Sequence, residues 1–121
     1  MVYDKYNFIE WRWFVMEFAK IEQAKQFSEE RFTKIDMLKT RKSVAFLLNF
    51  LPGQHMKSHS HPNRELYLLV IDGTGTIIID GEEKVVSVGD VIYCESDEMI
   101  GFTNTSDEKV TIYATMTKIA Q

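Results

Sequence analysis

The hydrophobic period of the chain changes once, after Arg31. Before that point, between residues 7 and 26, apolar side chains recur every three or four positions, which is typical of an amphipathic helix. Residues 18–21 also fit a short strand. The pattern predicts a helical or irregular N-terminal extension over residues 1–26. Its apolar stripe consists of Phe8, Trp11, Phe14, Val15, Phe18 and Ile21.

After Arg31, apolar positions alternate with polar ones, in short segments rich in Val, Ile, Tyr, Phe and Thr that turn residues separate. Between two of these segments, Asp80-Gly81 favours a two-residue type I′ hairpin turn, because that turn needs positive φ at both positions. No helical stretch separates the segments, so the pattern predicts an all-β barrel or sandwich over residues 27–121. The predicted strands cover residues 32–38, 43–51, 55–61, 65–71, 75–80, 83–88, 90–95, 99–104 and 109–117.

Composition and charge narrow the class of protein. With 121 residues and 14.1 kDa the chain is one ordinary domain, and 45% hydrophobic against 26% charged residues is typical of a globular protein. A net charge of −4 disfavours nucleic acid and anionic lipid as partners, so we interpret the basic run at residues 39–42 as a solvated turn. No apolar stretch approaches the ~20 residues of a membrane span, and no signal peptide is visible. The single cysteine, Cys94, excludes an internal disulfide and fits the cytoplasm.

The histidines carry the chemistry that the sequence suggests. His59-Ser-His61 places two imidazoles on one face of a strand with Cα atoms ~6.6 Å apart, close enough for both to reach one ion. Glu65 follows after the Pro62-Asn63 turn, where its carboxylate can face the same interior. Two histidines and one carboxylate form the facial triad of non-haem iron sites, which other divalent metals also accept. The sequence therefore predicts a metal site of His59, His61 and Glu65, and an exposed histidine pair is the alternative.

These residues resemble the first motif of the cupin superfamily: a glycine, five residues, His-x-His, three or four residues, a glutamate, about six residues and a glycine. Gly53, His59, His61, Glu65 and Gly73 follow this order, and Gly89, Asp90 and Asn104 fit the second motif. The resemblance covers about residues 27–118. It implies a cupin (jelly-roll-like) β-barrel with any ion near its axis. It also implies frequent homodimers, and activities that range from dioxygenases, decarboxylases and isomerases to non-catalytic binding.

The second motif departs from the family pattern. Glu95 stands in the place of its proline, Asp97 in the place of its glycine, and Ile100 in the place of its last metal-ligating histidine. Isoleucine cannot bind a metal, so the four-ligand site that the resemblance implies is reduced to three.

The first motif contains one residue too many, because seven residues instead of six separate Glu65 from Gly73. One extra residue reverses the two faces of a strand unless a bulge absorbs it. Either a bulge lies between Tyr67 and Asp72 and Glu65 faces inward, or Leu66 occupies the ligand position. We favour the bulge.

Other side chains are candidates to line the pocket. Tyr67, two residues after Glu65, is expected to face inward, where it would bind a ligand or pack in the core. Met99 and Ile100 are expected to form an apolar wall opposite the histidines, with an ordinary core as the alternative. His55 is ~13 Å from His59 along a straight strand, so we interpret it as a pocket-rim or surface histidine.

Two functions are consistent with the sequence. The first is a protein that binds a divalent metal (Fe, Mn, Ni or Zn) and a small polar molecule in the barrel, as a metal-dependent dioxygenase, decarboxylase or isomerase. The second is a non-catalytic small-molecule binding or sensing protein with a degenerate or empty metal site. No catalytic residue is assigned. The aromatic stripe of the extension is larger than a small barrel needs, and it predicts a homodimer.

Overall fold

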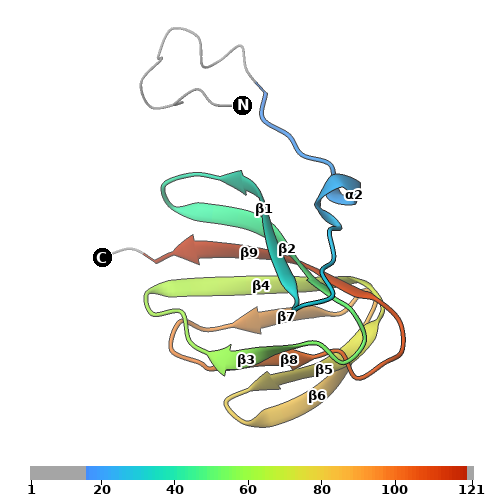
Figure 1. Cartoon of the computed structure of the whole chain (residues 1–121). Coiled ribbons are helices and arrows are strands. Elements are labelled where there is room, and N and C mark those ends of the chain that lie inside the picture. Colours follow the sequence, from blue (N-terminus) through green and yellow to red (C-terminus); the bar gives the residue numbers. More distant parts are fainter. Residues whose placement is uncertain (1–15, 120–121) are drawn as a thin grey trace, which may run out of the picture.

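The computed structural model describes residues 16–119 (Figure 1). Most of the predicted helix, and with it the aromatic stripe as far as Val15, lies outside the described residues. Within them the extension, expected to be helical or irregular, is irregular over residues 16–20, and only α2 (Ile21–Ala24) is helical. No helix of residues 16–119 is long and apolar enough to cross a membrane.

The described chain forms two antiparallel sheets, and its strands confirm all of the predicted segments. The larger sheet has the order β1-β2-β9-β4-β7, and the smaller sheet has the order β3-β8-β5-β6. The larger consists of β1 (Thr33–Lys39), β2 (Ser43–Phe50), β9 (Val110–Lys118), β4 (Arg64–Asp72) and β7 (Val91–Cys94). The smaller consists of β3 (His55–His59), β8 (Ile100–Thr103), β5 (Thr74–Ile79) and β6 (Glu82–Ser87). Asp80 and Gly81 join β5 to β6 with φ of 51° and 83°, as the hairpin prediction requires.

The hydrophobic core lies between the two sheets. On β4 the buried residues are Leu66, Leu68 and Val70, in strict alternation with residues of the opposite face. The smaller sheet contributes Ile77, Phe102 and others to the same cluster. We call the face of each sheet that carries these residues its inner face, and the opposite face its outer face. The alternation that predicted the strands is thus the alternation between core and surface.

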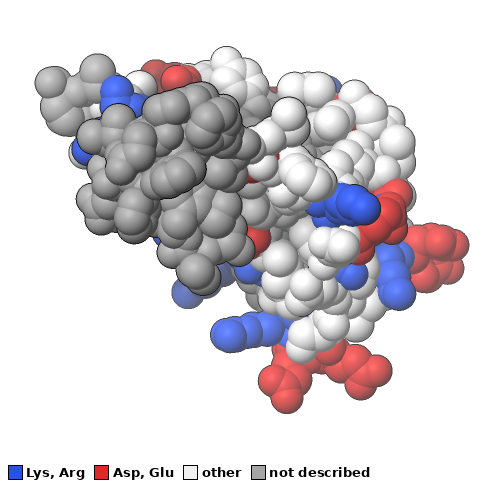
Figure 2. All heavy atoms as spheres, turned by 90° about the horizontal axis from the view of Figure 1, so that it is seen from above, with Lys and Arg blue, Asp and Glu red and all other residues white. Residues whose placement is uncertain are grey.

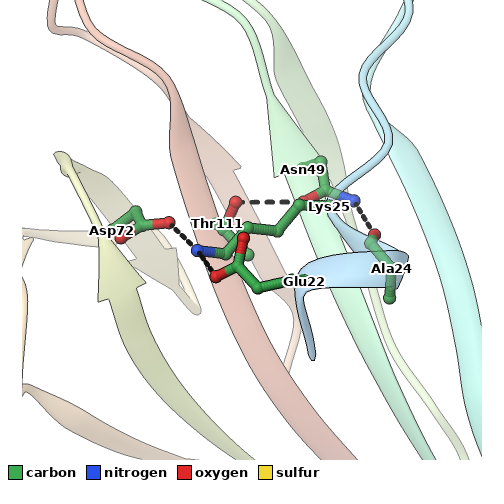
Figure 3. A network of polar contacts seen from close by, with 6 residues as sticks. All are labelled: Glu22, Ala24, Lys25, Asn49, Asp72 and Thr111. Atoms are coloured by element: carbon green, nitrogen blue, oxygen red, sulfur yellow. Dashed lines mark hydrogen bonds and ion pairs between the residues drawn. The ribbon is translucent and has the colours of Figure 1, made fainter. Parts of the chain in front are cut away.

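A buried polar network fixes the chain before β1 to the outer face of the larger sheet (Figure 3). The Asn49 Nδ2 donates to the Ala24 carbonyl oxygen at 2.9 Å, and the Thr111 hydroxyl donates to Asn49 Oδ1 at 3.0 Å. The Lys25 ammonium lies 2.8 Å from carboxylate oxygens of both Asp72 and Glu22, and these partners raise the pKa of Lys25. Tertiary contacts, rather than a long helix, therefore hold this segment. The predicted domain boundary between residues 26 and 27 stays a prediction.

Candidate functional site

His59 and His61 are brought together at the end of β3. Their ring centroids are 4.5 Å apart and their Nε2 atoms 3.2 Å apart. His59 lies opposite Ile100 in the β3–β8 pair, and directly opposite residues share a face, so the His59 side chain is on the inner face. The prediction that these two imidazoles converge agrees with this geometry.

One hydrogen bond determines which nitrogen of His59 carries the proton. Its Nδ1 lies 2.8 Å from the Lys57 carbonyl oxygen, and because a carbonyl only accepts, Nδ1 is the donor. In the neutral ring the Nε2 of His59 is then unprotonated and carries a free lone pair. It can accept the Nε2–H of His61, or it can bind an ion.

His61 has an incomplete set of hydrogen bonds. Its Nδ1 is buried and has no hydrogen-bond partner. Burial lowers the pKa of His61, and the charges of His59, Arg64 and Lys34 lower it further. The ring is therefore neutral at pH 7 and retains an unused buried polar atom.

Glu65 and Tyr67 lie on the outer face, away from the histidines. The Tyr93 hydroxyl donates to Glu65 Oε1 at 2.9 Å, and this carboxylate raises the pKa of Tyr93 to about 12. Tyr67 is 53% exposed, and its ring centroid is 5.0 Å from that of Tyr93. We favoured an inward-facing Glu65 and expected Tyr67 to line the interior. The structure has both side chains on the outer face instead.

The reason is the position of a bulge in β4. The bulge exists within the predicted interval between Tyr67 and Asp72, but it lies between Val70 and Asp72, too late in the strand to turn Glu65 inward. Before it the alternation runs unbroken, and Leu66, which is only 3% exposed, points inward. Counted back from Gly73 by the usual six residues, the glutamate position of the family motif is also Leu66. The alternative with Leu66 in the ligand position is the one that the geometry matches.

Met99 and Ile100, which were predicted to form one apolar wall, lie in different environments. Ile100 is completely buried in the core beside His59, as expected of a residue that points inward. Met99 is 43% exposed, and its backbone N–H donates to Asp80 Oδ1 at 2.8 Å. Ile100 therefore contributes to an apolar wall next to the histidines, and Met99 belongs to the surface.

A further bulge, between Met56 and His59, separates His55 from the other histidines. Met56 is buried on the inner face, so its neighbour His55 is on the outer face, where it is exposed. His55 is a surface histidine. A bulge within the His-containing strand is not visible in the sequence, because it depends on the register with β8.

The small number of ligand atoms limits how this site can bind a metal ion. Two nitrogens 3.2 Å apart can bind one ion, since bonds of ~2.05 Å would meet at an angle of about 100°. The remaining positions of the family site carry Leu66 and Ile100, and among residues 16–119 no group of three or more His, Cys, Asp or Glu side chains could hold a metal. The residues fit a two-nitrogen contact, and they do not fit a closed metal centre.

The sequence interpretation missed a set of basic residues at the same end of the barrel. Arg64 shares the inner face with Leu66, and Lys118 shares it with Met116, because each pair is two residues apart in one strand. Arg64 and Lys118 are direct partners in the β4–β9 ladder. The period-two alternation was a sufficient signal to place both side chains on the inner face.

Comparison with known proteins identifies the family. The protein-family model of the cupin domain matches residues 46–116, which is more than half of the chain. The chain is a cupin. Among curated proteins, none matches this cupin in sequence.

Solved structures share the fold of this cupin at low sequence identity. The protein TT1209 from Thermus thermophilus is 19% identical with a TM-score of 0.81, over 87% of this chain and 100% of that one. A Klebsiella pneumoniae protein with a double-stranded beta-helix domain is 20% identical with a TM-score of 0.81, over 86% and 91%. A predicted oxalate decarboxylase from Thermotoga maritima is 18% identical with a TM-score of 0.68, over 78% and 97%. These similarities establish the cupin barrel.

Proposed function

We propose that this cupin is a non-catalytic protein that binds a small polar molecule at the histidine end of its barrel. One observation carries the proposal. The His59 and His61 rings meet edge to face with their Nε2 atoms 3.2 Å apart, while the two other ligand positions of the family hold Leu66 and Ile100. The site has thus retained polar recognition groups without a complete set of metal ligands.

The unpartnered nitrogen of His61 supports binding rather than structure. A buried polar atom without a hydrogen bond costs about 1–3 kcal/mol, so a pair maintained only for stability would be expected to satisfy it. A bound molecule that offers a hydroxyl or another donor would remove this cost. Tyr67, the one predicted pocket residue whose hydroxyl could transfer a proton, lies on the outer face, and this favours binding over catalysis.

The test is identification of the bound molecule. Untagged protein is purified, and native mass spectrometry records whether a small molecule remains bound. His61→Ala is expected to lose it, and His55→Ala, which changes an exposed histidine of the same strand, is expected to keep it. If a molecule is retained equally by both variants, it does not contact the histidine pair. If turnover of a retained molecule appears in the parent and disappears in His61→Ala, the non-catalytic assignment is wrong.

A divalent ion is the second candidate ligand. The free lone pair on His59 Nε2 and its distance of 3.2 Å from His61 Nε2 favour it, with oxygen atoms of a ligand completing the coordination. Fe, Mn, Ni and Zn all accept imidazole nitrogen, and affinity is expected to be modest with two protein ligands. Elemental analysis after loading, with His59→Ala against His55→Ala, decides this candidate. A stoichiometric ion that His59→Ala retains would exclude the pair as its site.

We also propose that this cupin forms a homodimer through the outer face of β4 and β7. Tyr67, Tyr93 and Val91 are all exposed there, and Val91 lies opposite Leu69 in the ladder. Such a patch on an edge strand is suited to a second copy of the chain. Light scattering is expected to give a dimer, and Tyr93→Lys a monomer; a monomeric parent would contradict the proposal.

We propose the cytoplasm as the compartment, because the one cysteine is free and buried.

A further inference from the structure

Basic side chains line a groove at one end of the barrel. The groove has a volume of about 310 Å³ and lies where the β1–β2 turn, the start of β4 and the end of β9 meet, on the left of Figure 1. Among residues 16–119, its lining includes six Lys or Arg residues and a single Asp or Glu residue. The basic residues are Lys34, Lys39, Arg41, Lys42, Arg64 and Lys118, and the acidic residue is Asp36. Six basic side chains thus surround one groove in a chain of net charge −4.

Elsewhere on the surface, opposite charges are mixed. On the right of the face shown in Figure 2, Lys and Arg side chains lie beside Asp and Glu side chains. Among the described residues that line the groove, the one carboxylate, Asp36, is 2.7 Å from the Lys34 ammonium and compensates that charge. The excess of positive charge is carried chiefly by Lys39, Lys42, Arg64 and Lys118.

Arg64 and Lys118 carry the strongest argument. They are direct cross-strand partners, and both lie on the inner face beyond the last apolar residues of their strands. Two like charges opposite each other in a ladder are unfavourable. An anion between them would convert this repulsion into two favourable contacts.

The β1–β2 turn is held in place rather than free in solvent. The Thr40 hydroxyl oxygen accepts the backbone N–H groups of Lys42 at 3.2 Å and Ser43 at 3.1 Å. The backbone N–H of Lys118 donates to the Lys42 carbonyl oxygen at 2.8 Å, which joins the turn to β9. The basic run at residues 39–42 is a turn, as predicted, but its side chains meet those of two distant strands. A preorganised cluster loses little entropy when it binds.

The histidine pair lies near the groove, although neither ring is part of its lining. The backbone N–H of Arg64 donates to the His61 carbonyl oxygen at 3.1 Å. The positive charges of Arg64 and Lys34 also act on the His61 ring, so both lie within electrostatic reach of it. This proximity is consistent with a molecule whose charged end lies in the groove and whose other end reaches the histidines.

We propose that this groove binds the charged end of a small organic anion that carries carboxylate or phosphate groups. The inference rests on the proposed function and names its ligand class. Lysine and arginine are the side chains that recognise both groups, and a volume of about 310 Å³ is at the lower end of the range for small-molecule sites. Carboxylates and phosphates share this chemistry, and the experiment separates them.

The experiment is a titration followed by NMR, with citrate, glucose 6-phosphate and uncharged glucose as ligands at ~20 mM salt. Both anions, or one of them, are expected to shift the backbone signals of Lys42, Ser43, Arg64 and Lys118, and glucose is not. Raising the salt to ~0.5 M is expected to weaken binding at least tenfold, because the groove is open to solvent. The stronger of the two anions tells whether carboxylate or phosphate is preferred.

Paired variants test the residues. Arg64→Gln with Lys118→Gln is expected to raise the Kd of the stronger anion at least tenfold. Arg31→Gln with Lys84→Gln removes the same charge from exposed positions outside the groove and is expected to change the Kd less than twofold. An unchanged backbone spectrum away from the groove checks that both variants fold. Equal weakening in the two variants would overturn the proposal, since net charge alone would then explain binding.

Other outcomes overturn it as well. They are the absence of binding by either anion at low salt, glucose binding as tightly as its phosphate, and a single-stranded oligonucleotide binding tenfold more tightly than both anions. The proposed function fails separately. If the anions bind the groove and leave the ring signals of His59 and His61 unchanged, the groove is an anion site and the histidine pair is not part of it. If only uncharged molecules shift the ring signals, the pair binds a ligand and the anion class is wrong.

Discussion

Two groups of buried polar atoms in this cupin differ in how completely they are satisfied. Asn49 is fully buried and uses both ends of its amide, since it donates to Ala24 and Thr33 and accepts from Thr111. His61 keeps one buried nitrogen without a partner. The same chain thus contains a closed network and an open pair. A closed network stabilises the fold, whereas an open pair is suited to contact with something from outside.

The largest effect is expected from breaking the closed network. Asn49→Ala removes the amide that connects the chain before β1 to β9, and it leaves the Thr111 hydroxyl buried without an acceptor. We expect a loss of about 2–3 kcal/mol in the free energy of unfolding, measured by urea denaturation. Gln23→Ala, in the exposed part of the same segment, is the control and is expected to lose less than about 0.5 kcal/mol. A loss below about 1 kcal/mol in Asn49→Ala would mean that water replaces the amide.

The next effect comes from adding a third imidazole to the open pair. Ile100→His places a polar ring in the buried position opposite His59, so the metal-free protein is expected to lose about 1–3 kcal/mol of stability. Zn²⁺ is expected to restore part of it, because an ion that binds only the folded state stabilises that state. Melting curves with and without Zn²⁺ measure both effects.

Val86→His is the control for this variant. Val86 is equally buried, but β6 is the far edge of the sheet from β3, so its imidazole cannot join the pair. An equal Zn²⁺ shift in the two variants would show that residue 100 does not reach the ion.

Replacement of one member of the open pair is expected to change the free energy of unfolding much less. His61→Leu eliminates the unpartnered nitrogen and fills similar space, so the free energy of unfolding at pH 7.5 should change by no more than about 1 kcal/mol. Its dependence on pH should change clearly. The pKa of His61 in the fold is below its ordinary value of 6.5, so the unfolded chain binds the proton more readily and stability falls as pH drops below about 6.5.

This fall should be smaller in His61→Leu and should persist in His55→Leu. Urea denaturation at pH 7.5, 6.5 and 5.5 measures it. The same pH dependence in the parent and in both variants would show that His61 is not responsible.

The smallest effect is expected at the edge of the closed network. Lys25→Gln removes the ion pairs with Asp72 and Glu22 and should cost at most about 0.5 kcal/mol, because Glu22 and Asp72 are largely exposed. The pKa of Lys25 is raised in the fold, so its contribution is present below pH 10.5 and lost as the pH rises beyond that value. Denaturation should therefore show a smaller difference between parent and variant at pH 11 than at pH 8. A difference as large at pH 11 as at pH 8 would indicate lost packing rather than lost charge.

The sequence by itself determined the local part of this cupin. The period-two alternation predicted each strand, Asp80-Gly81 predicted a hairpin with positive φ, and His59-Ser-His61 predicted a converging pair. Each of these depends on neighbours within a few residues, whose backbone preferences and side-chain period are fixed by the chain itself. In the described part of the extension, which was expected to be helical or irregular, residues 16–20 are irregular and one helical turn ends at Ala24, where a hydrogen bond from Asn49 holds it against the sheet.

Only the tertiary structure decided which way the site faces. Glu65 lies outside and Leu66 inside because the bulge of β4 comes after Val70, and the position of a bulge depends on the ladder with β9. His55 and His59 face opposite sides for the same kind of reason, in the ladder with β8. The basic groove joins Lys34, Arg64 and Lys118, which are far apart in the sequence and meet only because β1, β4 and β9 belong to one sheet. Alternation gives each strand two faces, and pairing with other strands determines which face is turned inward and which side chains meet there.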